Sequence, residues 1–344
     1  MSMRVFKLFA MLLVVGVTAC GEGPGTGSDD GLVVYTARKE HLIKPLFDRF
    51  TAQTGIPIRY VTDAAGPLLA RLDAEGARSR ADILITVDAG NLWQAAQAGV
   101  LQPIQSPVLD ANIPASLRDE GNRWFGLSIR ARTIVYSAER VSNDELSTYE
   151  ALAEPRWSGR LCLRTSKKVY NQSLVATMIV ANGEAQTEAI IEDWVANLAV
   201  SPFSNDNKVV EAIAAGQCDV GVVNTYYLAR MVVDDPQLPV AMFWPNQSGE
   251  GAAGRGVHVN ISGAGITRAS QHVEQAQRLL EWLSGTDAQL QLALLNQEYP
   301  VNPLVGLPEP LKRWGEFRAD DIPVAEAGRL QPAAIRLMDR AGYR

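Results

Sequence analysis

The sequence predicts an α/β protein of two lobes, each a mixed sheet flanked by helices, joined by two extended hinge crossings. Short apolar strands alternate with helical stretches from residue 31 onward, which is typical of sheets covered on both faces. A second alternating series follows an extended segment, and a glycine-containing extended stretch then returns the chain. About 325 residues suffice for two lobes.

The first series has a strand–helix–strand–helix–strand order. Strands are expected at 31–35, 56–61 and 81–86, and helices at 40–55 and 68–76. This succession favours parallel strands, whose ligands bind beyond the carboxyl ends. The polar segments 36–41, 62–63 and 87–90 follow those ends and are expected to line one rim.

The second series begins after the extended segment 126–136. Strands are expected at 160–165, 218–224 and 240–244. The return segment 256–265 precedes a helix at 271–284 whose apolar residues follow the 3.6-residue period. We therefore predict an N-lobe of 31–129 plus 257–305 and a C-lobe of 130–256 plus 306–344.

The first thirty residues predict export and lipid attachment. Arg4 and Lys7 precede a short apolar run, and the run ends in small residues before Cys20. We expect 1–19 to be a lipoprotein signal peptide and 20–30 a flexible, glycine-rich tether. The mature protein would be periplasmic or otherwise extracytoplasmic and anchored to the membrane through lipidated Cys20, because no later uncharged apolar stretch reaches about 18 residues.

Net charge argues against a nucleic-acid partner. The full chain carries −6, and losing Arg4 and Lys7 leaves 30 basic against 38 acidic residues. Net charge describes solubility and steering, so it neither requires nor forbids a cationic ligand at one site.

Cysteine usage agrees with an oxidising compartment. Without Cys20, an even pair remains, Cys162 and Cys218, which we predict to form a disulfide. Each lies at the start of an expected strand and eight residues before a tyrosine, Tyr170 or Tyr226. Two free buried thiols remain the alternative, because geometry decides pairing.

Adjacent tyrosines, Tyr226 and Tyr227, follow the strand at 218–224 where a helix is expected to begin. Neighbouring side chains of a strand face opposite sides, whereas in a first helical turn they lie about 100° apart and can converge. Asn224 or Thr225 would cap this helix. With Tyr170, the phenols suggest a site for Fe(III), which prefers hard anionic oxygen, although a Tyr-Tyr pair alone more often reflects ordinary packing.

Several segments together resemble the periplasmic ferric-iron-binding proteins of ABC importers, which are class II solute-binding proteins with a transferrin-like cleft. They are 34–46, 81–90, 124–128, 146–150, 169–175 and 223–227. The resemblance spans about Leu32 to Pro303 and implies a type II periplasmic-binding-protein fold, with Tyr170, Tyr226 and Tyr227 as iron ligands. It further implies a binding protein rather than an enzyme, which hands iron to an inner-membrane ABC permease, and we expect a monomer.

One departure concerns the first lobe. Many relatives have a His-Tyr pair where this chain has Lys39 and Glu40, followed by His41. The chain thus resembles the subgroup in which three tyrosines and a synergistic anion, carbonate or bicarbonate, hold the metal. Glu40 or His41 would reach the metal only on closure, and Arg38, Arg130 and Arg132 are the candidate anion ligands, because guanidinium groups bind planar oxyanions through paired hydrogen bonds.

Two alternatives are open at this point. A receptor of the same fold could bind a polyamine, thiamine or an organic anion, with the tyrosines as stacking walls. A secreted hydrolase could use Glu40 and His41 as acid and base, although no third partner is evident. His258 and His272 are interpreted as packing or surface residues.

Overall fold

The computed structural model describes residues 31–344. The predicted signal peptide, tether and lipidated Cys20 lie outside the described residues. Within 31–344, none of the helices combines the length and the apolar character that a bilayer crossing requires.

Within residues 31–344, eight strands form one mixed sheet in the order β2-β1-β3-β8-β4-β6-β5, with β7 paired to β4. Pairs β1–β2, β1–β3 and β5–β6 are parallel, and β8 and β4 run antiparallel to their neighbours. The strands are β1 (Leu32–Thr36), β2 (Ile58–Thr62), β3 (Ile83–Thr86), β4 (Phe125–Ser137), β5 (Leu161–Cys162), β6 (Val220–Asn224), β7 (Val240–Phe243) and β8 (Val259–Ile266).

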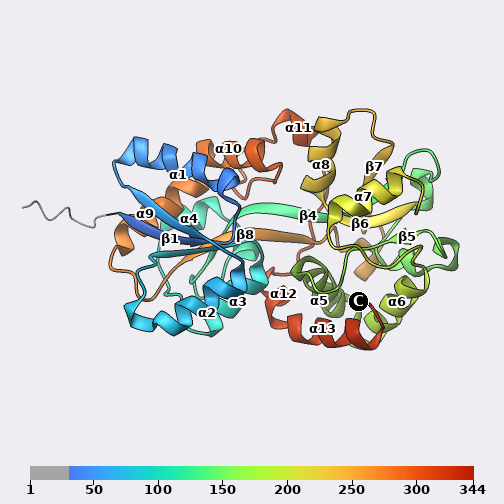
Figure 1. Ribbon diagram of the computed structural model, residues 1–344, viewed down its shortest axis with the longest axis horizontal. Helices are drawn as coiled ribbons and strands as arrows, with labels where there is room; N and C mark the ends of the chain where they lie inside the picture. Colours follow the sequence, from blue (N-terminus) through green and yellow to red (C-terminus); the bar gives the residue numbers. More distant parts are fainter. Residues whose placement is uncertain (1–30) are drawn as a thin grey trace, which may run out of the picture. The chain divides into compact units, whose positions relative to one another are not determined.

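Helices cover both faces of this sheet. In Figure 1, α1 and α10 lie above the strands β1 to β3, and α2 and α3 lie below them. The α-helices are α1 (Glu40–Thr54), α2 (Ala65–Glu75), α3 (Ala89–Gln97), α4 (Pro107–Asn112), α5 (Val169–Asn182), α6 (Glu184–Ala196), α7 (Asp206–Ala214), α8 (Thr225–Asp234), α9 (Val273–Ser284), α10 (Thr286–Asn296), α11 (Glu309–Lys312), α12 (Ala325–Arg329) and α13 (Gln331–Arg340).

Strands β4 and β8 occupy the positions of the two predicted crossings. The first half of β4 pairs with β8, and its second half pairs with β6 and β7. We call the part around β1 to β3 the N-lobe and the part around β5 to β7 the C-lobe. This arrangement confirms the two-lobed α/β fold class, while the exact lobe boundaries stay a prediction.

Buried apolar side chains form separate cores along β4. Leu127 packs with the N-lobe core, Ala131 packs with a C-lobe core, and the partly buried Ile129 contacts both. A further C-lobe cluster includes Val209 and Val223 on the α7 side of β6. The apolar cores of the two lobes therefore leave a region between them that is lined by polar side chains from the ends of strands and helices.

The C-terminal segment touches both lobes, whereas the sequence assigns 306–344 to the C-lobe alone. Helix α12 contacts α3 and α5, and α13 contacts α5 and α6. The α12–α3 approach is so close that a Cβ on Gly328 would lie 2.5 Å from the Cβ of Trp93. A glycine is therefore required at this crossing.

Candidate functional site

A cavity of about 160 Å³ lies between the lobes and contains all three predicted tyrosines. Its wall combines phenols with cationic groups. The lining residues are Ala37, Arg38, Lys39, Leu42, Val87, Arg130, Tyr170, Tyr226, Tyr227, Arg230 and Glu298. A larger hollow of about 300 Å³ near Leu72 and Arg268 lies elsewhere in the N-lobe and is bordered mainly by small side chains.

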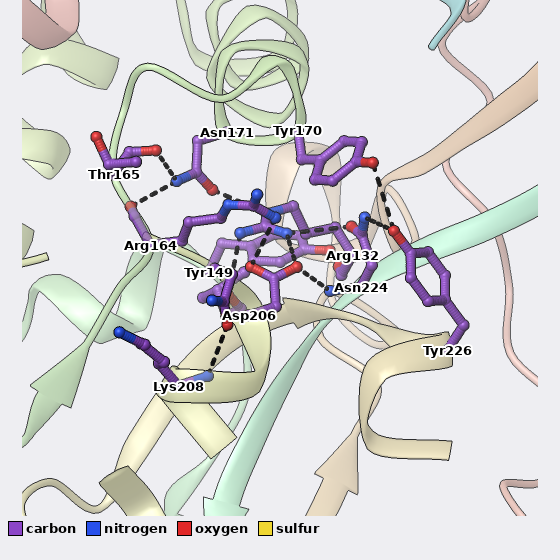
Figure 2. A network of polar contacts seen from close by, with 12 residues as sticks. Arg132, Tyr149, Arg164, Thr165, Tyr170, Asn171, Asp206, Lys208, Asn224 and Tyr226 are labelled. Atoms are coloured by element: carbon purple, nitrogen blue, oxygen red, sulfur yellow. Dashed lines mark hydrogen bonds and ion pairs between the residues drawn. The ribbon is translucent and has the colours of Figure 1, made fainter. Parts of the chain in front are cut away.

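The tyrosines come from the first turns of two helices. Tyr170 is the second residue of α5, and Tyr226 and Tyr227 are the second and third residues of α8. The helix following β6 starts where the sequence predicts, and Asn224 occupies its N-cap position without a side-chain capping bond. Figure 2 shows the Tyr170 and Tyr226 hydroxyl groups turned toward each other, with their oxygens 3.5 Å apart.

Burial favours the protonated form of Tyr226 and Tyr170 when no ligand is bound. It raises the pKa of Tyr226 well above its ordinary value, and the neighbouring phenols Tyr170 and Tyr227 add to the rise. Burial also raises the pKa of Tyr170, against a lowering by the Arg130 guanidinium. A cation that binds here must therefore displace phenolic protons, so its binding would weaken in acid.

Arg38 and Arg130, two of the three candidate anion ligands, both line the cavity. Arg38 forms an ion pair with Glu298 at 3.1 Å, and its guanidinium also donates to Ser262. Arg130 donates to the same serine at 3.3 Å and lies 5.2 Å from the centre of the Tyr170 ring. Within residues 31–344, the Nε and Nη2 atoms of Arg130 are buried without a hydrogen-bond partner, so donors remain for a bound anion.

Asp88 lies behind Arg130 and connects the lobes. Its carboxylate is 3.7 Å from the Arg130 guanidinium and accepts hydrogen bonds from Ser173 on α5 and from Asn260 on β8. Burial raises its pKa to about 6, against a lowering by Arg130. Asp88 thus offsets part of the positive charge on the anion side of the cavity.

Arg132 lies outside the cavity lining, so its predicted role as an anion ligand finds no support in the geometry. The side chain is buried beneath the tyrosines, where it pairs with Asp206 at 3.1 Å and donates to Asn171 and Asn224 (Figure 2). Nε donates to Asn171, Nη1 donates to Asp206 and Asn224, and Nη2 donates to the carbonyl of Val222. All three guanidinium nitrogens of Arg132 are therefore engaged inside the protein.

Glu40 and His41 are both exposed and do not line the cavity. Glu40 accepts a hydrogen bond of 2.7 Å from the Tyr60 hydroxyl. His41 borders a neighbouring hollow of about 320 Å³ that shares Leu42 and Arg230 with the cavity. Neither side chain is placed to act as a ligand in this arrangement.

Two charged residues of the cavity lining, Arg230 and Glu298, were missed from the sequence, and Lys39 was placed on the rim without a role. Glu298 follows α10 in a segment without a motif, and it meets Arg38 only through the fold. Arg230 lies three residues after Tyr227, which places it one helical turn along the same face, and this spacing could have revealed it. Its guanidinium lies 5.0 Å from the centre of the Tyr226 ring.

The predicted disulfide is present between Cys162 and Cys218. It joins β5 to the residue two places before β6, so it connects the segments that lead to Tyr170 and to Tyr226. Both cysteines are buried in the C-lobe.

His258 is buried as well, in agreement with its interpretation as a packing residue. Its Nδ1 lies 3.2 Å from the Thr177 hydroxyl, and it does not line the cavity.

Known proteins resemble this chain along nearly its whole length. Residues 45–319 match the family of bacterial extracellular solute-binding proteins. Iron uptake protein A1 of Synechocystis is 39% identical, covering 100% of this chain and 99% of that protein.

Two solved structures extend the likeness to the fold. One, described as Trichodesmium (IdiA) (FutA) in complex with iron and citrate ligands, is 41% identical with a TM-score of 0.87, covering 91% of this chain and 100% of that one. Apo ferric ion-binding protein A of Pasteurella haemolytica is 37% identical with a TM-score of 0.83, covering 91% and 98%. The resemblance that the motifs predict is confirmed, and the chain belongs to the family of bacterial extracellular solute-binding proteins.

Proposed function

We propose that this protein captures ferric iron in the periplasm, holds it with the phenolates of Tyr170, Tyr226 and Tyr227, and delivers it to an ABC permease. The single observation that carries this proposal is the convergence of three phenols on one interlobe cavity, with two hydroxyl oxygens 3.5 Å apart. Three phenolates would balance the three charges of Fe(III), and phenolate oxygen suits that ion.

A small oxyanion completes the proposed shell. Three tyrosines leave about half of an octahedral ion's positions open. The rest of the lining carries the cations Arg38, Lys39 and Arg130, and its carboxylate, Glu298, is already paired with Arg38 at 3.1 Å. Carbonate, bicarbonate or a similar anion would bind these cations through charge-assisted hydrogen bonds. Within residues 31–344, Arg130 Nε and Nη2 make no hydrogen bond, although Nη2 lies 3.7 Å from Asp88, and these donors support the assignment of Arg130 to this anion.

Binding and release would follow movement of the lobes about β4 and β8. The tyrosines belong to C-lobe helices, whereas Arg38 and Glu298 belong to the N-lobe side of the cavity. In the proposed cycle, iron binds the tyrosines first and the Arg38 side closes over it.

The names of the relatives, an iron uptake protein and a ferric ion-binding protein, support ferric iron as the cargo. Lipid attachment through Cys20 would keep the carrier near the permease.

The geometry gives no support to a hydrolase. Glu40 and His41 are exposed outside the cavity, and Glu40 is occupied by Tyr60. A receptor for another solute remains the alternative outcome of the test that follows.

Spectroscopy of the purified protein tests the proposal directly. Adding ferric citrate to iron-free protein should produce a visible phenolate-to-iron charge-transfer band, and bicarbonate should change its position or strength. A protein that stays colourless and retains no iron would contradict the assignment and favour an organic solute.

Single substitutions identify the ligands. Tyr226→Phe and Tyr227→Phe each remove one hydroxyl, and each should weaken ferric binding by more than the roughly 10- to 100-fold that loss of an outer-shell partner costs. Tyr299→Phe is a matched control, because Tyr299 is buried, lies outside the cavity lining and has no partner for its hydroxyl in the described part of the chain. Wild-type affinity in both ligand variants would exclude these residues as ligands.

A further inference from the structure

Two arginines share one carboxylate directly beneath the tyrosines. Arg132 binds Asp206 at 3.1 Å, and Arg164 forms an ion pair with the other carboxylate oxygen at 3.6 Å. All three side chains are buried, and Figure 2 shows them gathered around the Asp206 carboxylate. Two guanidinium groups share one carboxylate, so one positive charge in the interior is not balanced by this cluster. Burying such a charge lowers the stability of the folded protein unless a further group interacts with it.

The same network fixes the two segments that carry the phenols. Asn171, which follows Tyr170, accepts from Arg132 at 2.9 Å and donates to the Arg164 carbonyl at 2.8 Å. Asn224, which precedes α8, accepts from Arg132 at 3.1 Å, and its backbone N–H donates to Asp206 at 3.2 Å. The starts of α5 and α8 are therefore held to one common cluster.

Arg164 also contacts one of the phenols directly. Its guanidinium carbon lies 5.2 Å from the centre of the Tyr170 ring, within the range of a cation–π interaction. Arg164 does not line the cavity, so it reaches the Tyr170 ring from behind.

Resting on the proposed function, we propose that Arg164 is a positioning residue for metal capture: its planar guanidinium, held by Asp206, orients the Tyr170 ring so that the phenolic oxygen faces the metal. Arg132 fixes the backbone of the two segments, and Arg164 fixes the Tyr170 side chain. A lysine at this position would retain the charge but lose the planar group that packs on the ring.

Arg164→Gln tests this role, because Asp206 would still be paired with Arg132 and no carboxylate would be left uncompensated. The full chain is titrated with ferric citrate while the charge-transfer band is recorded, and its unfolding is followed separately in the iron-free state. We expect affinity to fall roughly tenfold or more, as for other outer-shell partners, and the band maximum to move, because the band reports the geometry of the phenolates.

Arg160→Gln is a closely matched control. Arg160 also shares its carboxylate, Asp219, with a second arginine, and its guanidinium lies 5.0 Å from the ring of Trp157. It lies away from the cavity, so its loss should leave both affinity and band unchanged.

The position of the band decides the outcome. An unmoved band in Arg164→Gln, or an equal shift in Arg160→Gln, would overturn the proposal even if affinity or stability fell. If Arg164→Gln does not fold, Arg164→Lys is judged by the same criterion, and failure of both variants to fold would assign Arg164 to stability alone. A wild-type protein without any band would instead refute the iron-binding function itself.

Discussion

At the residue scale, His258 makes stability depend on pH. Burial, followed by the Arg255 and Arg132 charges, lowers its pKa from 6.5 to about 3. The folded protein therefore holds this imidazole neutral, whereas the unfolded chain protonates it below pH 6.5. Between those two values the unfolded state binds more protons, so His258 makes the free energy of unfolding fall as pH falls, by up to about 1.4 kcal/mol per pH unit.

Replacing His258 by Gln should remove this contribution. We expect urea unfolding of His258→Gln at pH 6.5, 5.5 and 4.5 to show a shallower pH dependence than the wild type, although the variant can be less stable overall because of the Thr177 contact. His41→Gln, at an exposed position, should keep the wild-type slope. Equal slopes for wild type and His258→Gln would show that His258 is not held neutral.

Single residues differ in how well the sequence reveals them. Tyr226 and Tyr227 were found because their residue type and their place at a helix start both carry information. Arg132 was assigned to the anion because a guanidinium suits either an anion or an internal carboxylate, and only the fold shows that Asp206 lies beside it. Glu298 gave no signal, because its ion pair with Arg38 joins segments 260 residues apart in the sequence.

At the scale of elements, the disulfide should stabilise the C-lobe by restricting the unfolded chain. Cys162 and Cys218 are 56 residues apart, so their bond closes a long loop. Replacing both by Ser should lower the free energy of unfolding by about 2–4 kcal/mol, measured by denaturant titration. Wild type and double variant should become equally stable under conditions that reduce the disulfide, and an unchanged midpoint in the oxidised state would contradict this role.

Elements were predicted best where periodicity and end signals agree. The helix expected at 40–55 is α1 (Glu40–Thr54), closed by Gly55 in the left-handed conformation. The strand expected at 160–165 shortens to β5 (Leu161–Cys162), because the next residues exchange backbone hydrogen bonds with Phe203 in a loop. Residues 163–165 therefore stay extended, but they pair with a loop instead of a strand. No local sequence pattern predicts which segment they pair with.

At the scale of the whole molecule, the proposed ligand would connect the two lobes and so stabilise them together. Phenols from the C-lobe and Arg38 from the N-lobe line one cavity. The succession of strands predicted two lobes and two crossings, but it did not predict that the C-terminal helix α12 contacts both α3 and α5. Such contacts link the lobes away from the cavity, and favour unfolding of residues 31–344 as one unit.

Ferric iron should therefore raise the unfolding temperature of the entire protein in a single transition. A ligand that binds only the folded state at about 100 times its Kd adds about 2.7 kcal/mol to the free energy of unfolding. Calorimetry with and without ferric citrate should show this shift in the wild type and lose it in the Tyr226→Phe/Tyr227→Phe double variant, because two anionic ligands are gone. An equal shift in both proteins would mean that iron binds elsewhere, and a separate transition for one lobe would mean that the cargo does not couple them.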